Sequence, residues 1–169
     1  MRYILAVMAL TVCAYIGHHK SARIDKRRKL LEILHADINE VNDLMEYRRD
    51  SVAKIVERMS ARDKTGLWKT LSERLNENDT LANLWAEALE ELSKRGSLSP
   101  LSVEELDMLR EFGMFWGMSD AQTQRANILH TLKRIEACIA ALNDEYARTG
   151  KMYKSLGILG GLAMAIMII

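Results

Sequence analysis

Two uncharged apolar runs, one near each end of the chain, constrain this sequence more than any other feature. The first extends from Tyr3 to Ile16 (YILAVMALTVCAYI), and the second extends from Leu156 to Ile169. Both runs are apolar on all sides, so neither offers water the polar face of a soluble surface helix. Tyrosine and basic residues at their edges are typical of segments that end at a membrane surface. We therefore predict a membrane segment at each end, residues 3–17 and 155–169.

The two runs are short for membrane spans. Each has fourteen residues, which form a helix about 21 Å long, against a hydrocarbon core about 30 Å thick. Runs of this length also occur as core helices and as the apolar centre of a signal peptide. A signal peptide carries its positive charges before the apolar run, whereas here most of them follow it. The order of charges therefore favours a retained anchor.

Basic residues flank the inner side of both runs and form what we call the membrane rim. They are Lys20, Arg23, Lys26, Arg27, Arg28 and Lys29 after the first run, and Lys151 and Lys154 before the second. Basic residues near the ends of a span stay in the cytoplasm, and they attract anionic lipid headgroups. We expect the body, residues 18–154, in the cytoplasm and both ends of the chain outside. The two cysteines give no disulfide framework and fit a reducing compartment.

The body has the composition of one all-α domain. Its 137 residues contain a single proline, Pro100, and no alternating strand pattern, and this length suits one hydrophobic core. Apolar heptads extend from Leu31 to Met45 and from Ile128 to Tyr146. Such repeats form seams between helices. We predict an antiparallel bundle of about six helices, with the three tryptophans in its core.

Capping signals predict where the shorter helices begin and end. Ser102-x-x-Glu105 and Ser119-x-x-Gln122 have the pattern of capping boxes. The other expected helices extend from Ser51 to Met59 with Asp50 as cap, from Gly66 to Leu75, and from Asn78 or Asp79 to Lys94, before Gly96.

No motif in the sequence points to catalysis. It contains no glycine-rich phosphate loop, no Gly-x-Ser-x-Gly elbow and no Cys-x-x-Cys pair. Glu32-x-x-His35 has the spacing of a di-iron motif, but the second motif that such a site needs is replaced by Asn127-x-x-His130. We expect no enzymatic activity, no cofactor and no small-molecule substrate. A membrane-tethered metal-binding bundle that uses Glu32 and His35, or an enzyme, is the alternative.

The net charge of +1 conceals two regions of opposite sign. Residues 18–29 contain six basic residues and one acidic residue, whereas residues 79–111 contain eight acidic and three basic residues. The membrane explains the basic region, so we expect no nucleic-acid partner. The acidic region is either a solvated surface or a docking surface for a basic cytosolic partner. Its candidate docking residues are Glu87, Glu90, Glu91, Glu104, Glu105 and Glu111.

Four segments spread along the chain share their patterns with one protein family. They are LHADINEVNDL in the first heptad segment, NLWAEAL in the middle, FGMFWGMSDAQTQ from Phe112 to Gln124, and the closing GKMYKSLGILGGL. In these segments the chain resembles stage III sporulation protein AB of endospore-forming bacteria. It departs from the family pattern between Tyr47 and Ile55, which lacks the Thr-Pro-Leu often found after the first helix, and at Trp116, where leucine is usual.

The resemblance implies a cytosolic domain similar to that of the inner-membrane platform protein of type II secretion and type IV pilus machines. It also implies membership of the channel complex that joins mother cell and forespore, alongside a cytosolic ATPase of the secretion type. No catalytic or cofactor residues come with it. We therefore expect a non-catalytic platform or adaptor in the mother-cell membrane around the forespore, with the lipid bilayer, the ATPase and other channel proteins as partners.

Overall fold

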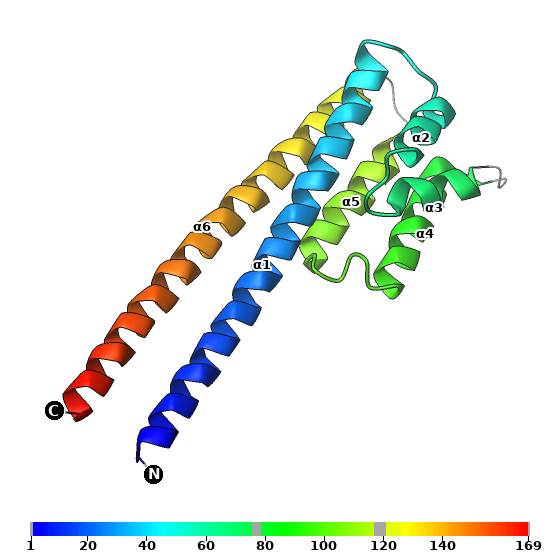
Figure 1. Ribbon diagram of the computed structural model, residues 1–169. Coiled ribbons are helices and arrows are strands. Elements are labelled where there is room, and N and C mark those ends of the chain that lie inside the picture. The colour runs from blue at the N-terminus through cyan, green and yellow to red at the C-terminus, as the bar shows by residue number, and fades with distance from the viewer. Residues whose placement is uncertain (1, 76–78, 117–120, 169) are drawn as a thin grey trace. The chain divides into compact units, whose positions relative to one another are not determined.

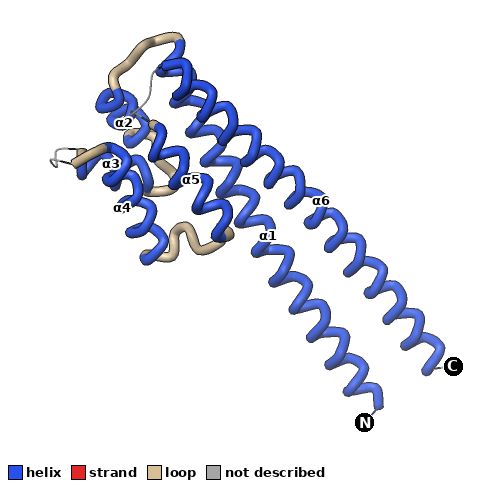
Figure 2. Tube along the Cα trace, turned by 180° about the vertical axis from the view of Figure 1, so that it is seen from behind, coloured by secondary structure: helices blue, strands red, loops and turns tan. Residues whose placement is uncertain are grey.

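The computed structural model describes the backbone of residues 2–75, 79–116 and 121–168, and the side chains of residues 22–75, 79–116, 122–149 and 152. The described backbone forms six α-helices and no strand, which confirms the all-α prediction (Figures 1 and 2). The helices are α1 (Arg2–Glu46), α2 (Val52–Ser60), α3 (Leu67–Arg74), α4 (Leu81–Lys94), α5 (Val103–Phe115) and α6 (Ala121–Ile168). Two long helices at the ends of the chain therefore enclose four short ones in sequence.

The chain divides into two compact units. The smaller unit combines Met1–Arg28 with Ala140–Ile169, and the larger unit is Lys29–Ile139. Both predicted membrane segments belong to the smaller unit. Their described backbone, residues 3–17 and 155–168, is helical, but their side chains lie outside the described residues. The same holds for three rim residues, Lys20, Lys151 and Lys154. Within the part of the chain whose side chains are described, no helix is both long enough and apolar enough to cross a bilayer.

In the larger unit, α1 and α6 lie side by side and antiparallel. His35 Nε2 of α1 lies 3.2 Å from Glu136 Oε1 of α6, and Arg125 Nη2 lies 2.9 Å from Glu46 Oε1. Among the predicted heptad positions of this unit, Met45 and Ile139 are half-buried. The other seven are buried: Leu31, Leu34, Ile38, Val41, Ile128, Leu132 and Ile135. The prediction of a seam is confirmed for these residues. The prediction is wrong for Tyr146, the last predicted seam position, because its side chain is 43% exposed.

The turn between α2 and α3 is held by one carboxylate. Asp63 Oδ1 accepts hydrogen bonds from the backbone N–H groups of Thr65 and Gly66 at 2.8 and 2.9 Å, and Oδ2 accepts one from Lys69 N–H at 2.9 Å. Gly66 has a φ of 85°, a left-handed conformation that glycine adopts at low cost. The predicted Gly66–Leu75 helix is confirmed, with these two residues as its caps.

Two of the predicted N-caps are wrong. Ser51, not Asp50, is the N-cap of α2, because the Asp50 carboxylate pairs with Lys54 at 3.0 Å and with Arg48 at 3.2 Å. Thr80 is the N-cap of α4, where its side chain accepts a hydrogen bond from the backbone N–H of Asn83. The neighbouring Asp79 instead accepts hydrogen bonds from the Thr80 N–H and the Asn83 side chain, and Asn78 lies outside the described residues.

The other predicted boundaries agree with the structure where it describes them. The Ser102–Glu105 capping box has both of its hydrogen bonds, and α4 ends at Lys94 before Gly96, whose φ is 80°. Ser119 lies outside the described residues. The chain also breaks after α1, although the Thr-Pro-Leu pattern is missing, because Arg49 adopts a left-handed φ of 51°. Few non-glycine residues adopt this conformation.

The core of the larger unit is an aromatic cluster, as predicted for the three tryptophans. Trp68 of α3, Trp85 of α4 and Trp116 after α5 are each 1% exposed. Their ring centroids lie 5.4 to 5.8 Å apart, with edge-to-face angles that suit aromatic quadrupoles. Phe112 extends the cluster at 5.2 Å from Trp85. These contacts fix α3, α4 and α5 against one another and so position the surface residues that they carry.

Candidate functional site

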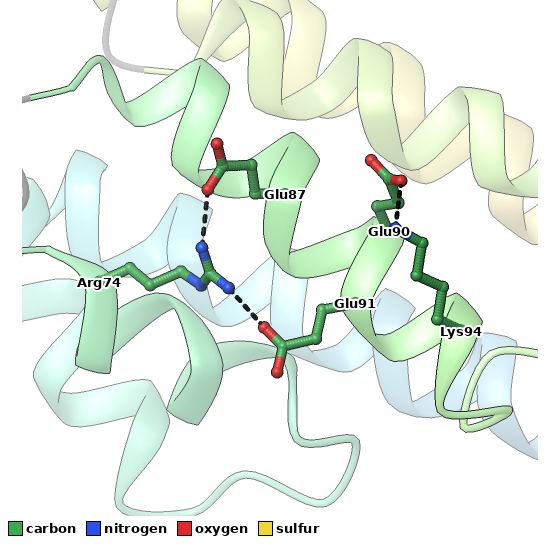
Figure 3. A pocket seen from close by; sticks show the side chains of 5 residues that line it. All are labelled: Arg74, Glu87, Glu90, Glu91 and Lys94. Atoms are coloured by element: carbon green, nitrogen blue, oxygen red, sulfur yellow. Dashed lines mark hydrogen bonds and ion pairs between the residues drawn. The ribbon is translucent and has the colours of Figure 1, made fainter.

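Three of the six predicted docking residues lie together on α4, where basic side chains face them (Figure 3). The guanidinium of Arg74 on α3 donates one hydrogen bond to Glu87 Oε2 and one to Glu91 Oε2, each 2.7 Å long. Lys94 Nζ lies 2.7 Å from Glu90 Oε1, and Arg95 also pairs with Glu91. We call these six residues, Arg74, Glu87, Glu90, Glu91, Lys94 and Arg95, the α4 ion-pair cluster.

The charges of the α4 ion-pair cluster cancel. Three glutamates face three cations, and five of the six residues line a shallow pocket of about 300 Å³. The hydrogen bond from Lys94 lowers the pKa of Glu90 and raises the pKa of Lys94. The hydrogen bond from Arg74 lowers the pKa of Glu91. These three groups therefore remain ionised around neutral pH, and the cluster is a neutral set of charges and not a strongly negative patch.

The other three predicted docking residues belong to α5 and differ from one another. Glu104 is exposed in the first turn of the helix, and Glu111 pairs with Arg134 of α6. Glu105 is 1% exposed, and its carboxylate accepts a hydrogen bond from the backbone N–H of Ser102 at 2.8 Å. This burial excludes Glu105 from any docking surface, because its carboxylate serves the capping box.

Reasoning from sequence missed the role of Arg74. The acidic region of the sequence comprises residues 79–111 and does not include Arg74. The Arg74 side chain contacts this region because α3 packs against α4. The pairs Glu90–Lys94 and Glu91–Arg95 have the i, i+4 spacing and could be found from sequence. The Arg74 contacts could not, because no local pattern encodes them.

The alternative metal site gains no support from the geometry. Glu32 is exposed, and His35 faces Glu136 across the seam between α1 and α6. Among the residues that the structure describes, no group of three or more His, Cys, Asp or Glu side chains could hold a metal ion.

A larger cavity, not predicted from sequence, lies where α1 ends and α6 begins. Its volume is about 680 Å³, and it is lined by Asn42, Met45, Glu46, Arg49, Asp50, Gln122, Arg125 and Ile128. We call it the α1–α6 cavity. Its residues are far apart in sequence and come together only because the two helices are antiparallel.

Comparison with known proteins connects this fold to one family. The family model described as stage III sporulation protein AB matches residues 2–169. Among solved structures, the chain is similar to one titled "Stage III sporulation protein AB (SpoIIIAB)", with a TM-score of 0.63 and 19% sequence identity. That similarity covers 72% of this chain and 97% of the other, and it shows the fold alone. No match was found among curated proteins. The family match over nearly the full length confirms the resemblance found in the sequence, and the chain belongs to the stage III sporulation protein AB family.

Proposed function

We propose that this protein is a non-catalytic, membrane-anchored platform of the sporulation channel between mother cell and forespore, and that it couples to a cytosolic secretion-type ATPase. The observation that carries the proposal is the family match over residues 2–169, which includes both apolar ends. The larger unit supports it. Its interior is filled by apolar and aromatic side chains, and the acidic residues of its α4 surface pair with neighbouring cations.

The two long helices suit a platform. Each continues as one helix from the larger unit into an apolar end of the chain. At about 1.5 Å of rise per residue, the 45 residues of α1 and the 48 residues of α6 correspond to about 70 Å of helix each. A continuous helix transmits an applied load without the slack of a flexible linker. In this proposal, a force exerted by the ATPase on the body reaches the membrane through α1 and α6.

The α4 ion-pair cluster is the proposed contact for a basic surface of the ATPase. Glu87 and Glu90 are exposed and Glu91 is half-buried, and ion pairs at the protein surface contribute only about 0–1 kcal/mol each. Glu87, Glu90 and Glu91 can therefore exchange their own cations for those of a partner at little cost. Because the charges of the cluster cancel, it attracts a partner weakly from a distance, and recognition depends on that exchange at contact.

Two triple variants with opposite charge test this contact. Replacing the three glutamates by glutamine (Glu87→Gln, Glu90→Gln, Glu91→Gln) leaves Arg74, Lys94 and Arg95 unbalanced. The matched variant (Arg74→Gln, Lys94→Gln, Arg95→Gln) leaves the glutamates unbalanced. We expect the first to capture less ATPase than the wild-type chain from sporulating cells at physiological salt, and to lower sporulation frequency. The second should capture at least as much as the wild type.

Both variants carry three substitutions in the α4 ion-pair cluster and remove the same ion pairs, so a difference between them cannot come from lost ion pairs alone. Equal capture by the two variants would contradict a contact through these glutamates. Normal sporulation in a strain whose only copy is the first variant would contradict it as well. Circular dichroism of both full-length variants in detergent checks that the helices remain folded.

A further inference from the structure

The stretch from Arg48 to Lys69, which contains α2 and the turns on either side of it, is strongly basic. It has seven basic and three acidic residues, a net charge of +4. Six of the seven basic side chains are exposed. Within this stretch, all of which the structure describes, Glu57 is the only exposed acidic residue. The surface therefore differs from the α4 ion-pair cluster, in which the charges cancel.

The other two acidic side chains of the stretch are directed inward. The Asp50 side chain is 8% exposed, and its carboxylate lies 3.0 Å from Lys54 Nζ and 3.2 Å from Arg48 Nε. The Asp63 side chain is half-buried in the turn whose backbone N–H groups it binds. Because Lys54 and Arg48 share one carboxylate, the exposed surface keeps an excess of positive charge.

Three of these cations follow one side of α2 and the turn after it: Lys54, Arg58 and Arg62. Successive members are four residues apart, and side chains with this spacing lie on the same face of a helix. Lys54 is 61% exposed, Arg62 is 72% exposed and Arg58 is half-buried. Arg62 lies 3.8 Å from Glu40 of α1, which is a long ion pair. We call these three residues the α2 basic stripe.

Helix α5 carries a stripe of the opposite sign. Glu104, Asp107 and Glu111 have i, i+3 and i+7 spacing, which places them on one helix face, and all three are exposed. Asp107 pairs with Arg110 of the same helix, and Glu111 pairs with Arg134 of α6. Pairs of this kind at a protein surface contribute only about 0–1 kcal/mol, so their acidic members can change partners at little cost. We call the three acidic residues the α5 acidic stripe.

We propose that the α2 basic stripe of one copy of this chain docks on the α5 acidic stripe of a second copy. The two stripes carry three charges each, of opposite sign and with similar spacing, and complementary charges give an interface its specificity and register. Within one copy the stripes have other partners, since Lys54 pairs with Asp50 and Asp107 pairs with Arg110. An anionic lipid or a nucleic acid would also meet the basic stripe, but neither accounts for the matching acidic one.

This contact goes beyond the proposed function and does not depend on it, because neither stripe includes a residue of the α4 ion-pair cluster. Since every copy carries both stripes, two copies can make the contact twice in a symmetric pair.

The test measures association of full-length copies in vesicles of neutral phosphatidylcholine. Each copy carries a donor or an acceptor dye on a cysteine appended after Ile169, in a background without Cys13 and Cys138. Resonance energy transfer between the dyes, followed as a function of protein density, reports association. We expect wild-type copies to associate, and to associate less when the salt concentration rises from about 0.05 M to about 0.5 M, because salt screens exposed charges.

Two variants exchange the charges of one stripe each. The first (Lys54→Glu, Arg62→Glu) makes the α2 stripe acidic, and the second (Asp107→Lys, Glu111→Lys) makes the α5 stripe basic. Each variant alone should associate at least about tenfold more weakly than the wild type, because like charges then face each other.

An equal mixture of the two variants separates a contact between copies from every other use of these residues. In the mixture, the altered stripe of one variant meets the altered stripe of the other with opposite charges, so most of the wild-type association should return. The control variant (Glu73→Lys, Lys133→Glu) reverses one exposed charge of each sign outside both stripes and should associate as the wild type does. Circular dichroism checks that all variants remain helical.

Four results would overturn the proposal. The first is absence of association between wild-type copies, and the second is a mixture that associates no better than either variant alone. The third is a loss of association in only one of the two variants, because one stripe would then meet a different surface. The fourth is loss of wild-type association when phosphatidylserine replaces part of the lipid, because the basic stripe would then bind anionic headgroups in preference to a second copy.

Discussion

Among the three glycines whose surroundings the structure describes, Gly113 leaves the least space for an added methyl group. A Cβ atom there would lie 2.0 Å from Cδ1 of Trp85. The indole cannot withdraw, because it is 1% exposed and its Nε1 donates a 2.7 Å hydrogen bond to the Leu109 carbonyl. We expect Gly113→Ala to lower the free energy of unfolding by about 1–3 kcal/mol or more, as overpacking of a core does.

Urea unfolding of the full-length chain in detergent, followed by circular dichroism, measures this loss. Met114→Ala is the matched control, because Met114 is the next residue and is 61% exposed. Its effect should stay within about 0.5 kcal/mol. An unchanged midpoint for Gly113→Ala would mean that the indole does not lie against this glycine.

Asp37 gives a prediction about pH. Burial raises the pKa of this carboxyl above its ordinary value of 3.8, although the hydrogen bond from Trp68 Nε1 acts in the opposite direction. A raised folded-state pKa means that the folded protein binds the proton more tightly than the unfolded chain. The associated stability is fully present below pH 3.8 and is lost as the pH rises through the folded-state pKa.

Asp37→Asn should therefore raise stability at neutral pH, because the amide keeps an acceptor for Trp68 and carries no charge to desolvate. The gain should disappear at acidic pH, where Asp37 itself is protonated. Thermal unfolding of wild type and variant across the acidic range measures it. A gain that is the same at every pH would show that charge burial is not its cause.

At the scale of helices, the seam between α1 and α6 is the feature that the sequence predicted best. Leu34 and Ile135 are each 1% exposed. Leu34→Ala and Ile135→Ala should each cost about 2–5 kcal/mol, because both remove buried methyl groups and leave a cavity. Leu129→Ala, at a position of α6 that is 42% exposed, is the control and should cost much less. Losses below about 0.5 kcal/mol for both buried positions would contradict the seam.

Local sequence patterns predicted the helices. The contacts between helices that are distant in sequence could not be predicted. The heptads and the Ser102–Glu105 box depend on residues within a few turns of one another, and the structure contains both. Aspartate is a common N-cap residue, but the carboxylate of Asp50 pairs with Lys54 and that of Asp79 accepts a hydrogen bond from the Asn83 side chain. The N-cap is therefore the following residue in each case, Ser51 or Thr80.

The candidate sites were harder to predict than the helices, for the same reason. Pairing of Arg74 with Glu87 depends on how α3 packs on α4, and the α1–α6 cavity depends on the antiparallel meeting of two helices far apart in sequence. Sequence reasoning placed Glu105 both in a capping box and on a docking surface. A carboxylate used in a cap cannot also face a partner, so the capping motif alone could have removed Glu105 from the docking candidates.

At the scale of the whole molecule, the proposed membrane anchoring leads to a prediction about topology. The rim residues lie on the inner side of both apolar runs, and basic residues at the ends of a span stay in the cytoplasm. We therefore predict a cytoplasmic body with both ends of the chain outside. Glu90 is a suitable reporter, because its side chain is 63% exposed on α4 and a cysteine there is open to a soluble reagent.

Glu90→Cys, in a background without Cys13 and Cys138, should resist a membrane-impermeant maleimide in intact cells and react after lysis. A cysteine appended after Ile169 in the same background is the control and should react before lysis. Labelling at both positions in intact cells would place the body outside and contradict the platform model, because a cytosolic ATPase could not reach it. Protection at both positions would keep the body inside but refute the outward placement of the C-terminal end. Only protection of Glu90→Cys together with labelling of the appended cysteine agrees with a membrane segment that carries its basic rim on the cytoplasmic side.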